Sequence, residues 1–137
     1  MAKIILVSGV GDSGKTESIR LFLANRGIVF PNAPRDILRI LHIQKGGHIL
    51  TVGVASGGDT LAIVKKNFQF FSQHPCNIIV CASKSRGRTI KYIQSEGAQP
   101  GNRMAPLIST RKIHPFNQAQ ADRDNVRVAS EIERNIP

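Results

Sequence analysis

Apolar residues form short continuous runs that alternate with stretches of helical spacing along the chain. Residues 4–7 are a continuous apolar run of the kind found in strands buried on both faces, and residues 48–55 and 76–82 have the same character. Between these runs, residues 15–26 and 60–73 carry apolar side chains three and four positions apart, which predicts amphipathic helices. Strands that alternate with helices are typical of a parallel sheet covered by helices.

The rest of the pattern is less regular. It predicts a short strand at 28–30, a short helix at 36–43, a helix at 88–94, a loop at 96–104, an edge strand at 105–113 and a closing helix at 117–136. No internal repeat or second domain is visible. We therefore expect one domain over residues 1–137 with an α/β fold: a three-layer α/β/α sandwich around a mainly parallel sheet of four or five strands.

Composition narrows the classes of function. Lys and Arg number 19 against 9 Asp and Glu, a formal net charge of +10, which predicts attraction to phosphate-rich partners. Only 5% of residues are aromatic, too few for an extended platform that stacks bases. No apolar run is long enough to span a membrane, the first residues do not fit a signal peptide, and two cysteines make no disulfide scaffold. We expect a cytoplasmic protein without a membrane partner.

One motif carries clear chemistry. The segment Gly-Val-Gly-Asp-Ser-Gly-Lys-Thr at 9–16 fits G-x-x-x-x-G-K-[ST], and it stands between a predicted strand and a predicted helix. Its glycines let backbone N–H groups turn inward around an anion, and the helix N-terminus adds partial positive charge. In this pattern Lys15 reaches the β- and γ-phosphates of a nucleotide, and the Thr16 hydroxyl is a ligand of Mg²⁺.

This segment is the P-loop, or Walker A motif, and over residues 3–26 the chain resembles the P-loop NTPase superfamily. Within this superfamily, the chain is most similar to nucleoside and nucleotide kinases, because it is small, the predicted helix after the loop is short, and it lacks the Asn-Lys-x-Asp motif that selects guanine. The resemblance implies ATP and Mg²⁺ as cofactors. The expected cofactor-binding residues are Gly9, Gly11, Asp12, Ser13, Gly14, Lys15, Thr16 and Glu17, although Asp12 and Glu17 would repel a phosphate that they faced.

Two further acids are candidates. Asp59 follows the apolar run 48–55 and could hold Mg²⁺ together with Thr16, but three residues separate it from the run, whereas a Walker B acid follows directly. Asp59 together with Thr60 could equally cap the following helix. Asp36 lies where nucleotide kinases bind their acceptor, so it is a candidate catalytic base, with a helix cap as the alternative.

Basic residues concentrate in segment 84–112, which holds seven Lys or Arg and one acid. Arg86 and Arg88 follow the run 76–82, and parallel sheets bind ligands at the carboxyl ends of their strands. Either arginine could stabilise charge on a transferring phosphoryl group, as Lys15 could, so we count all three as candidate catalytic residues. Ordinary solvated surface charges are the alternative for the pair.

Three functions are compatible with these residues. The first is a small Mg²⁺-dependent kinase that transfers the γ-phosphoryl group of ATP to a small nucleotide-like acceptor. The second is an NTPase whose hydrolysis is coupled to nucleic-acid binding through segment 84–112. The third is a nucleotide-binding module without turnover, suggested by the displaced Asp59. The identity of the acceptor and the oligomeric state are not encoded in any pattern that we can read.

Overall fold

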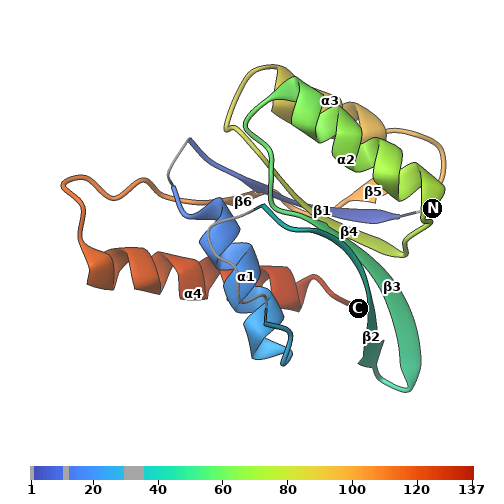
Figure 1. Ribbon diagram of the computed structural model, residues 1–137, viewed down its shortest axis with the longest axis horizontal. Coiled ribbons are helices and arrows are strands. Elements are labelled where there is room, and N and C mark those ends of the chain that lie inside the picture. Colours follow the sequence, from blue (N-terminus) through green and yellow to red (C-terminus); the bar gives the residue numbers. More distant parts are fainter. Residues whose placement is uncertain (1, 11–12, 30–35) are drawn as a thin grey trace.

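The computed structural model describes residues 2–10, 13–29 and 36–137, and these form an α/β fold with a mixed six-stranded sheet and four helices (Figure 1). No helix within these ranges has the length and apolar content needed to cross a membrane. The strands are β1 (Lys3–Ser8), β2 (Leu38–Lys45), β3 (His48–Ala55), β4 (Ile78–Ser83), β5 (Arg103–Met104) and β6 (Ile108–Ser109). The helices are α1 (Lys15–Asn25), α2 (Leu61–Gln73), α3 (Arg88–Gly97) and α4 (Gln118–Arg134).

The strands follow the order β2-β3-β4-β1-β5, and β6 pairs with β1 further along the same edge as β5. Only β2 and β3 run antiparallel among the described pairs, and the others are parallel. Because Ser8 lies opposite Ser83, β1 and β4 end side by side. The carboxyl ends of the parallel strands therefore share one edge, which is where open α/β sheets bind ligands.

Both faces of the sheet bury apolar side chains. Ile5 and Val7 of β1 pack into a cluster with residues of α1 and α4, whereas Ile4 and Leu6 pack into a second cluster with residues of α2 and α3. This division follows from the period of two in a strand, which points successive side chains to opposite faces. Figure 1 shows α2 and α3 on one side of the sheet and α1 and α4 on the other.

The predicted helix at 36–43 is wrong, because this stretch lies mainly in β2. Leu38 and Ile40 pack into the cluster under α2, and Ile43 packs into the cluster under α1, so the strand is apolar on both faces. That spacing also fits a helix, which explains the error. The deciding signal is the turn, where Gly46 and Gly47 have φ of 58° and 80° and return the chain into β3.

Other predicted elements agree more closely. The strand 48–55 is confirmed as β3, and the helices predicted at 15–26, 60–73, 88–94 and 117–136 are confirmed within a few residues. The strand at 28–30 is wrong for Ile28 and Val29, and Phe30 lies outside the described residues. The predicted loop at 96–104 is confirmed for residues 98–102, between the end of α3 and β5, and the predicted edge strand at 105–113 is confirmed only for β6. The sheet has six strands rather than four or five because β5, β6 and β2 join it.

The packing of α4 can be tested by making the same substitution, valine to alanine, at a buried and at an exposed position of the helix. Val128 is fully buried, whereas Val126 on the opposite face of the helix is 55% exposed. We expect Val128→Ala to lower the free energy of unfolding by about 2 kcal/mol, because it removes buried methyl groups and leaves a cavity. Val126→Ala should change it by less than about 0.5 kcal/mol. Urea denaturation measures both, and equal losses would contradict the described face of α4.

Candidate functional site

A pocket of about 470 Å³ opens at the carboxyl edge of the sheet. Its walls are residues 13–17 at the start of α1, Asp36, residues 56–59 after β3, and several side chains between Arg111 and Asn125. The last group comes from the segment that leads into α4 and from the first turns of that helix. Four segments that are far apart in the sequence therefore meet around one cavity.

Two glycines of the 9–16 segment allow close backbone contacts around this site. Gly14 caps α1 with φ of 87°, a left-handed conformation, and a Cβ there would lie 2.7 Å from Asn125 Oδ1. A Cβ on Gly9 would lie 1.9 Å from Thr110 Oγ1, so the backbone packs directly against the end of β6. Ser13 and Thr110 join the two segments through a hydrogen bond between their hydroxyls. Gly11 and Asp12 lie outside the described residues.

Lys15 lies at the centre of the pocket wall. It is only 7% exposed, and its Nζ donates hydrogen bonds to the Gly9 carbonyl at 2.8 Å and to Asp59 Oδ1 at 3.2 Å. The Asp59 side chain is 60% exposed, so this ion pair joins the buried base of the pocket to its mouth. Thr16 and Glu17 line the same pocket one and two residues further along α1.

The position of Asp59 depends on the loop 56–58, which is buried. Its backbone is fixed because the Asn67 amide donates to the Gly57 carbonyl at 2.9 Å and Ser56 N–H donates to the Ile37 carbonyl at 2.9 Å. A Cβ on Gly58 would lie 2.0 Å from the carbonyl oxygen of Ala82, the penultimate residue of β4. The loop therefore crosses the end of β4 at a distance that only glycine permits.

This crossing explains why Asp59 does not follow its strand directly. Because β4 lies between β3 and β1, the chain must travel about 10 Å from the end of β3 to reach Lys15. Three residues span about that distance, and residues 56–58 provide them. The alternative, that Asp59 together with Thr60 caps the following helix, is confirmed for Thr60 alone, which caps α2 by accepting from Ile63 N–H.

Asp36 lines the same pocket, and its carboxylate lies against the loop 56–58, where a Cβ on Gly57 would be 2.8 Å from Asp36 Oδ2. No helix begins at Asp36, since β2 starts at Leu38, so its alternative role as a helix cap is wrong. The structure thus brings Lys15, Thr16, Asp36 and Asp59 together from three separate segments.

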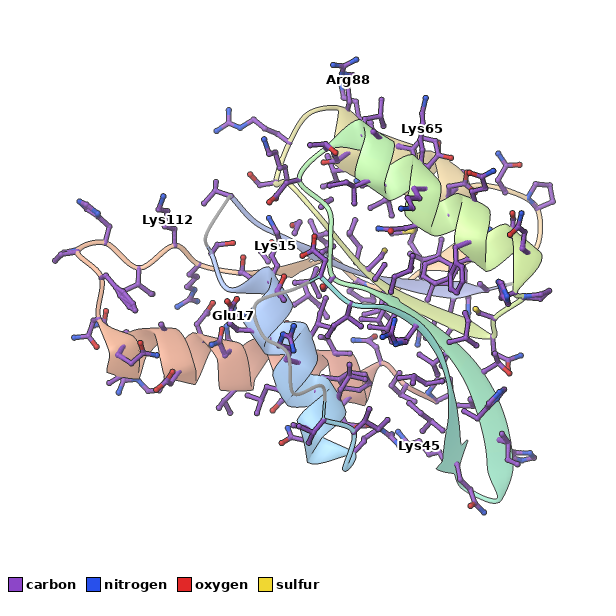
Figure 2. The ribbon with its side chains drawn as sticks, viewed as in Figure 1. Lys15, Glu17, Lys45, Lys65, Arg88 and Lys112 are labelled. Atoms are coloured by element: carbon purple, nitrogen blue, oxygen red, sulfur yellow. The ribbon has the colours of Figure 1, made fainter. Side chains whose placement is uncertain are left out.

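Arg86 and Arg88 are exposed between β4 and the start of α3, and neither is among the residues that line the pocket. Figure 2 shows Arg88 at the N-terminal end of α3, pointing away from Lys15. The basic residue that does line the pocket from segment 84–112 is Arg111. The carboxyl end of β4 is crossed by the loop at Gly58, so residues that follow this strand lie outside the pocket.

Sequence reasoning missed the wall that α4 provides. Asp124 is 8% exposed and accepts a hydrogen bond from Arg111 N–H at 2.9 Å. Asn125 accepts one from Ser18 Oγ and contacts Gly14. A signal was available, because Asp124 precedes Val128 and Ile132 at helical spacing and so places a carboxylate on the buried stripe of α4.

The two cysteines take no part in this site. Burial raises the pKa of the Cys76 and Cys81 thiols, so both stay protonated at neutral pH and behave as core residues. Among the described residues, no group of three or more His, Cys, Asp or Glu side chains is arranged to hold a metal ion. A magnesium ion in the pocket would therefore depend on ligands from the protein and from the nucleotide together.

Neither a protein-family model nor a curated protein matches this chain. A function for the protein has to be inferred from the residues that surround the pocket, their contacts and their charges.

The crossing at Gly58 can be tested directly. We expect Gly58→Ala to lower the free energy of unfolding by about 1–3 kcal/mol, because the added methyl group collides with the Ala82 carbonyl. Ser85→Thr adds one methyl group at an exposed position just after β4 and should leave stability within about 0.5 kcal/mol. Urea denaturation measures both, and a fully stable Gly58→Ala protein would show that the loop takes another path.

Proposed function

We propose that this chain is a P-loop protein with a three-layer α/β/α architecture that binds ATP with Mg²⁺ and transfers the γ-phosphoryl group to a small nucleotide-like acceptor. The observation that supports this most is the contact between Lys15 Nζ and Asp59 Oδ1, 3.2 Å apart at the N-terminal end of α1. It joins the cation of the 9–16 motif to a carboxylate from the end of a second strand, within one pocket.

The polyphosphate would bind at the start of α1. The helix end contributes free N–H groups and partial positive charge, and Gly14 leaves no side chain in front of them. The Lys15 ammonium lies in the same wall, with two of its contacts made to the carbonyl oxygens of Gly9 and Val10. These are weak partners compared with a phosphate, so a triphosphate would compete well for the ammonium group.

The donor set fits magnesium. Thr16 and Asp59 offer a hydroxyl and a carboxylate oxygen on one pocket, the hard oxygen ligands that Mg²⁺ prefers, and few protein ligands suffice because the ion retains waters and phosphate oxygens. Bound magnesium neutralises charge that develops on the β- and γ-phosphates.

Asp36 is the proposed base. In the transfer, an acceptor hydroxyl oxygen bonds to the γ-phosphorus, the bond from that phosphorus to the β,γ-bridging oxygen breaks, and the hydroxyl proton moves to the Asp36 carboxylate. ADP leaves with the electron pair of the broken bond. A small organic acceptor is favoured over water because Ile113 and Phe116 add apolar side chains to the lining of the pocket.

Hydrolysis coupled to nucleic-acid binding is the second candidate. It is favoured by Arg111, which belongs to the basic segment 84–112 and also lines the pocket, so a bound nucleic acid could touch the reaction site. The third candidate, a nucleotide-binding module without turnover, is suggested by the three residues between Asp59 and its strand. That argument is weakened because the loop has to pass β4 to reach Lys15.

Lys15→Ala tests nucleotide binding. We expect the affinity for ATP with Mg²⁺ to fall about 10- to 100-fold, because charge-assisted hydrogen bonds to phosphate are lost. Lys66→Ala removes the same charge from an exposed position on α2 and should change the affinity by less than about twofold. Isothermal titration calorimetry measures both dissociation constants. Unchanged affinity in Lys15→Ala would refute the proposed phosphate site.

The fate of a γ-phosphate label separates kinase from hydrolase. The protein is incubated with Mg²⁺, γ-labelled ATP and a panel of nucleosides, nucleotides and oligonucleotides, and we expect label on a nucleoside or nucleotide. Label found in free phosphate alone, at a rate raised by nucleic acid, would support the second candidate instead.

Asp36→Asn probes the base in the same assay. Transfer should slow about 10²- to 10⁴-fold while ATP affinity is kept, because the amide cannot accept the proton. Glu96→Gln, a change of the same kind on α3, should leave transfer unaffected. Transfer by Asp36→Asn at the wild-type rate would rule out Asp36 as the base.

A further inference from the structure

A second pocket of about 430 Å³ adjoins the first beside α4. The two share Arg111, Ile113 and Asp124 in their walls, so they are neighbouring parts of one surface depression. The remaining lining residues of the second pocket are Gln120, Arg123 and Arg127. Three guanidinium groups and one carboxylate therefore surround this space.

Arg127 and Asp124 form the fixed part of this pocket. Arg127 Nη2 lies 2.8 Å from Asp124 Oδ1 and also donates to the Ser109 carbonyl at 2.6 Å, which ties α4 to the end of β6. Arg127 Nη1 lies 3.4 Å from Glu131 Oε1. The positive charge of Arg127 is thus balanced by carboxylates, and its role is to hold the wall.

Arg111 and Arg123 differ from Arg127 in their partners. Neither guanidinium lies within ion-pair distance of a carboxylate among the residues in the described ranges. The nearby Asp122 accepts a hydrogen bond from the Gln118 amide at 2.6 Å. Asp124 accepts from the backbone N–H of Arg111, so the carboxylate that neutralises Arg127 also fixes the position of Arg111. Within the described ranges, two guanidinium groups without a carboxylate partner therefore line one preformed pocket.

We propose that Arg111 and Arg123 form a second phosphate site, which binds the phosphate group of a nucleotide acceptor while the P-loop pocket holds the triphosphate. Guanidinium groups bind phosphate oxygens through paired N–H donors, and two of them can hold one dianionic phosphate. The shared wall at Arg111 places this phosphate next to the pocket that contains Lys15 and Asp36. The inference rests on the proposed function, and it adds which residues hold the acceptor's phosphate and that a nucleoside without this phosphate is a poor acceptor.

The same chemistry has two sources, a free nucleoside monophosphate and the terminal phosphate of an oligonucleotide. The probes are therefore the common nucleoside 5′-monophosphates, a short single-stranded oligonucleotide with a 5′-phosphate, and the matching nucleosides and oligonucleotide without it. Binding is measured by calorimetry with and without a saturating non-hydrolysable ATP analogue and Mg²⁺, because the analogue fills the P-loop pocket.

We expect at least one phosphorylated probe to bind at least about tenfold more tightly than its unphosphorylated counterpart. The double variant Arg111→Gln/Arg123→Gln should weaken that binding at least about tenfold. The matched control Lys66→Gln/Arg134→Gln removes two positive charges that line neither pocket and should stay within about twofold of the wild type. Preference for the mononucleotide or for the phosphorylated oligonucleotide identifies the source.

Two results would overturn the inference: phosphorylated probes that bind no better than their counterparts, or a double variant that binds them as the wild type does. Lys15→Ala keeps this test separate from the proposed function. It should weaken binding of the ATP analogue about 10- to 100-fold while the phosphorylated probe still binds and still depends on Arg111 and Arg123. Should the analogue fail to bind the wild type, the proposed function falls, and the comparison of variants still decides the second site.

Discussion

Where the chain leaves β3, its backbone passes over the end of β4 so closely that Gly58 and the Ala82 carbonyl exclude any side chain between them. This contact sets the height of the loop 56–58 above the sheet, and the loop in turn places Asp59 at Lys15 and supports Asp36. A loop lifted by one methyl group would move both carboxylates away from the start of α1. The positions of the charged side chains in the pocket therefore depend first on how closely the backbone packs at Gly58.

The opposite wall depends on a different kind of constraint. Asp124 lies on the buried stripe of α4, where a carboxylate is costly unless its oxygens are fully used. Its two oxygens satisfy that condition by binding Arg127 and the backbone of Arg111. The hydrogen bond from Arg111 N–H to Asp124 connects the segment after β6 to α4. The buried Asp124 carboxylate thus holds the segment after β6 against α4 and fixes the positions of Arg111 and Arg127.

The strands at the centre of the sheet and the helices could be predicted from the sequence, because a period of two or of 3.6 marks them independently of their neighbours. Segment 36–43 could not, since its apolar residues fit both periods and the choice depends on pairing with β3. The 9–16 motif located Lys15 and Thr16 because it is local. The approach of Asp59 to Lys15 depends on strand order, which no local pattern encodes, and so does the position of Arg86 and Arg88 outside the pocket.

The contact between Lys15 and Asp59 couples two binding events in the proposed function. A triphosphate that takes the Lys15 ammonium leaves the Asp59 carboxylate facing a polyanion, which is a repulsive arrangement at short range. A divalent cation held by that carboxylate turns the repulsion into attraction. Nucleotide and cation should therefore each raise the affinity for the other by the same factor, as thermodynamic linkage requires. In the proposed function, the ion pair of the free protein would thereby make metal-free nucleotide a poor ligand.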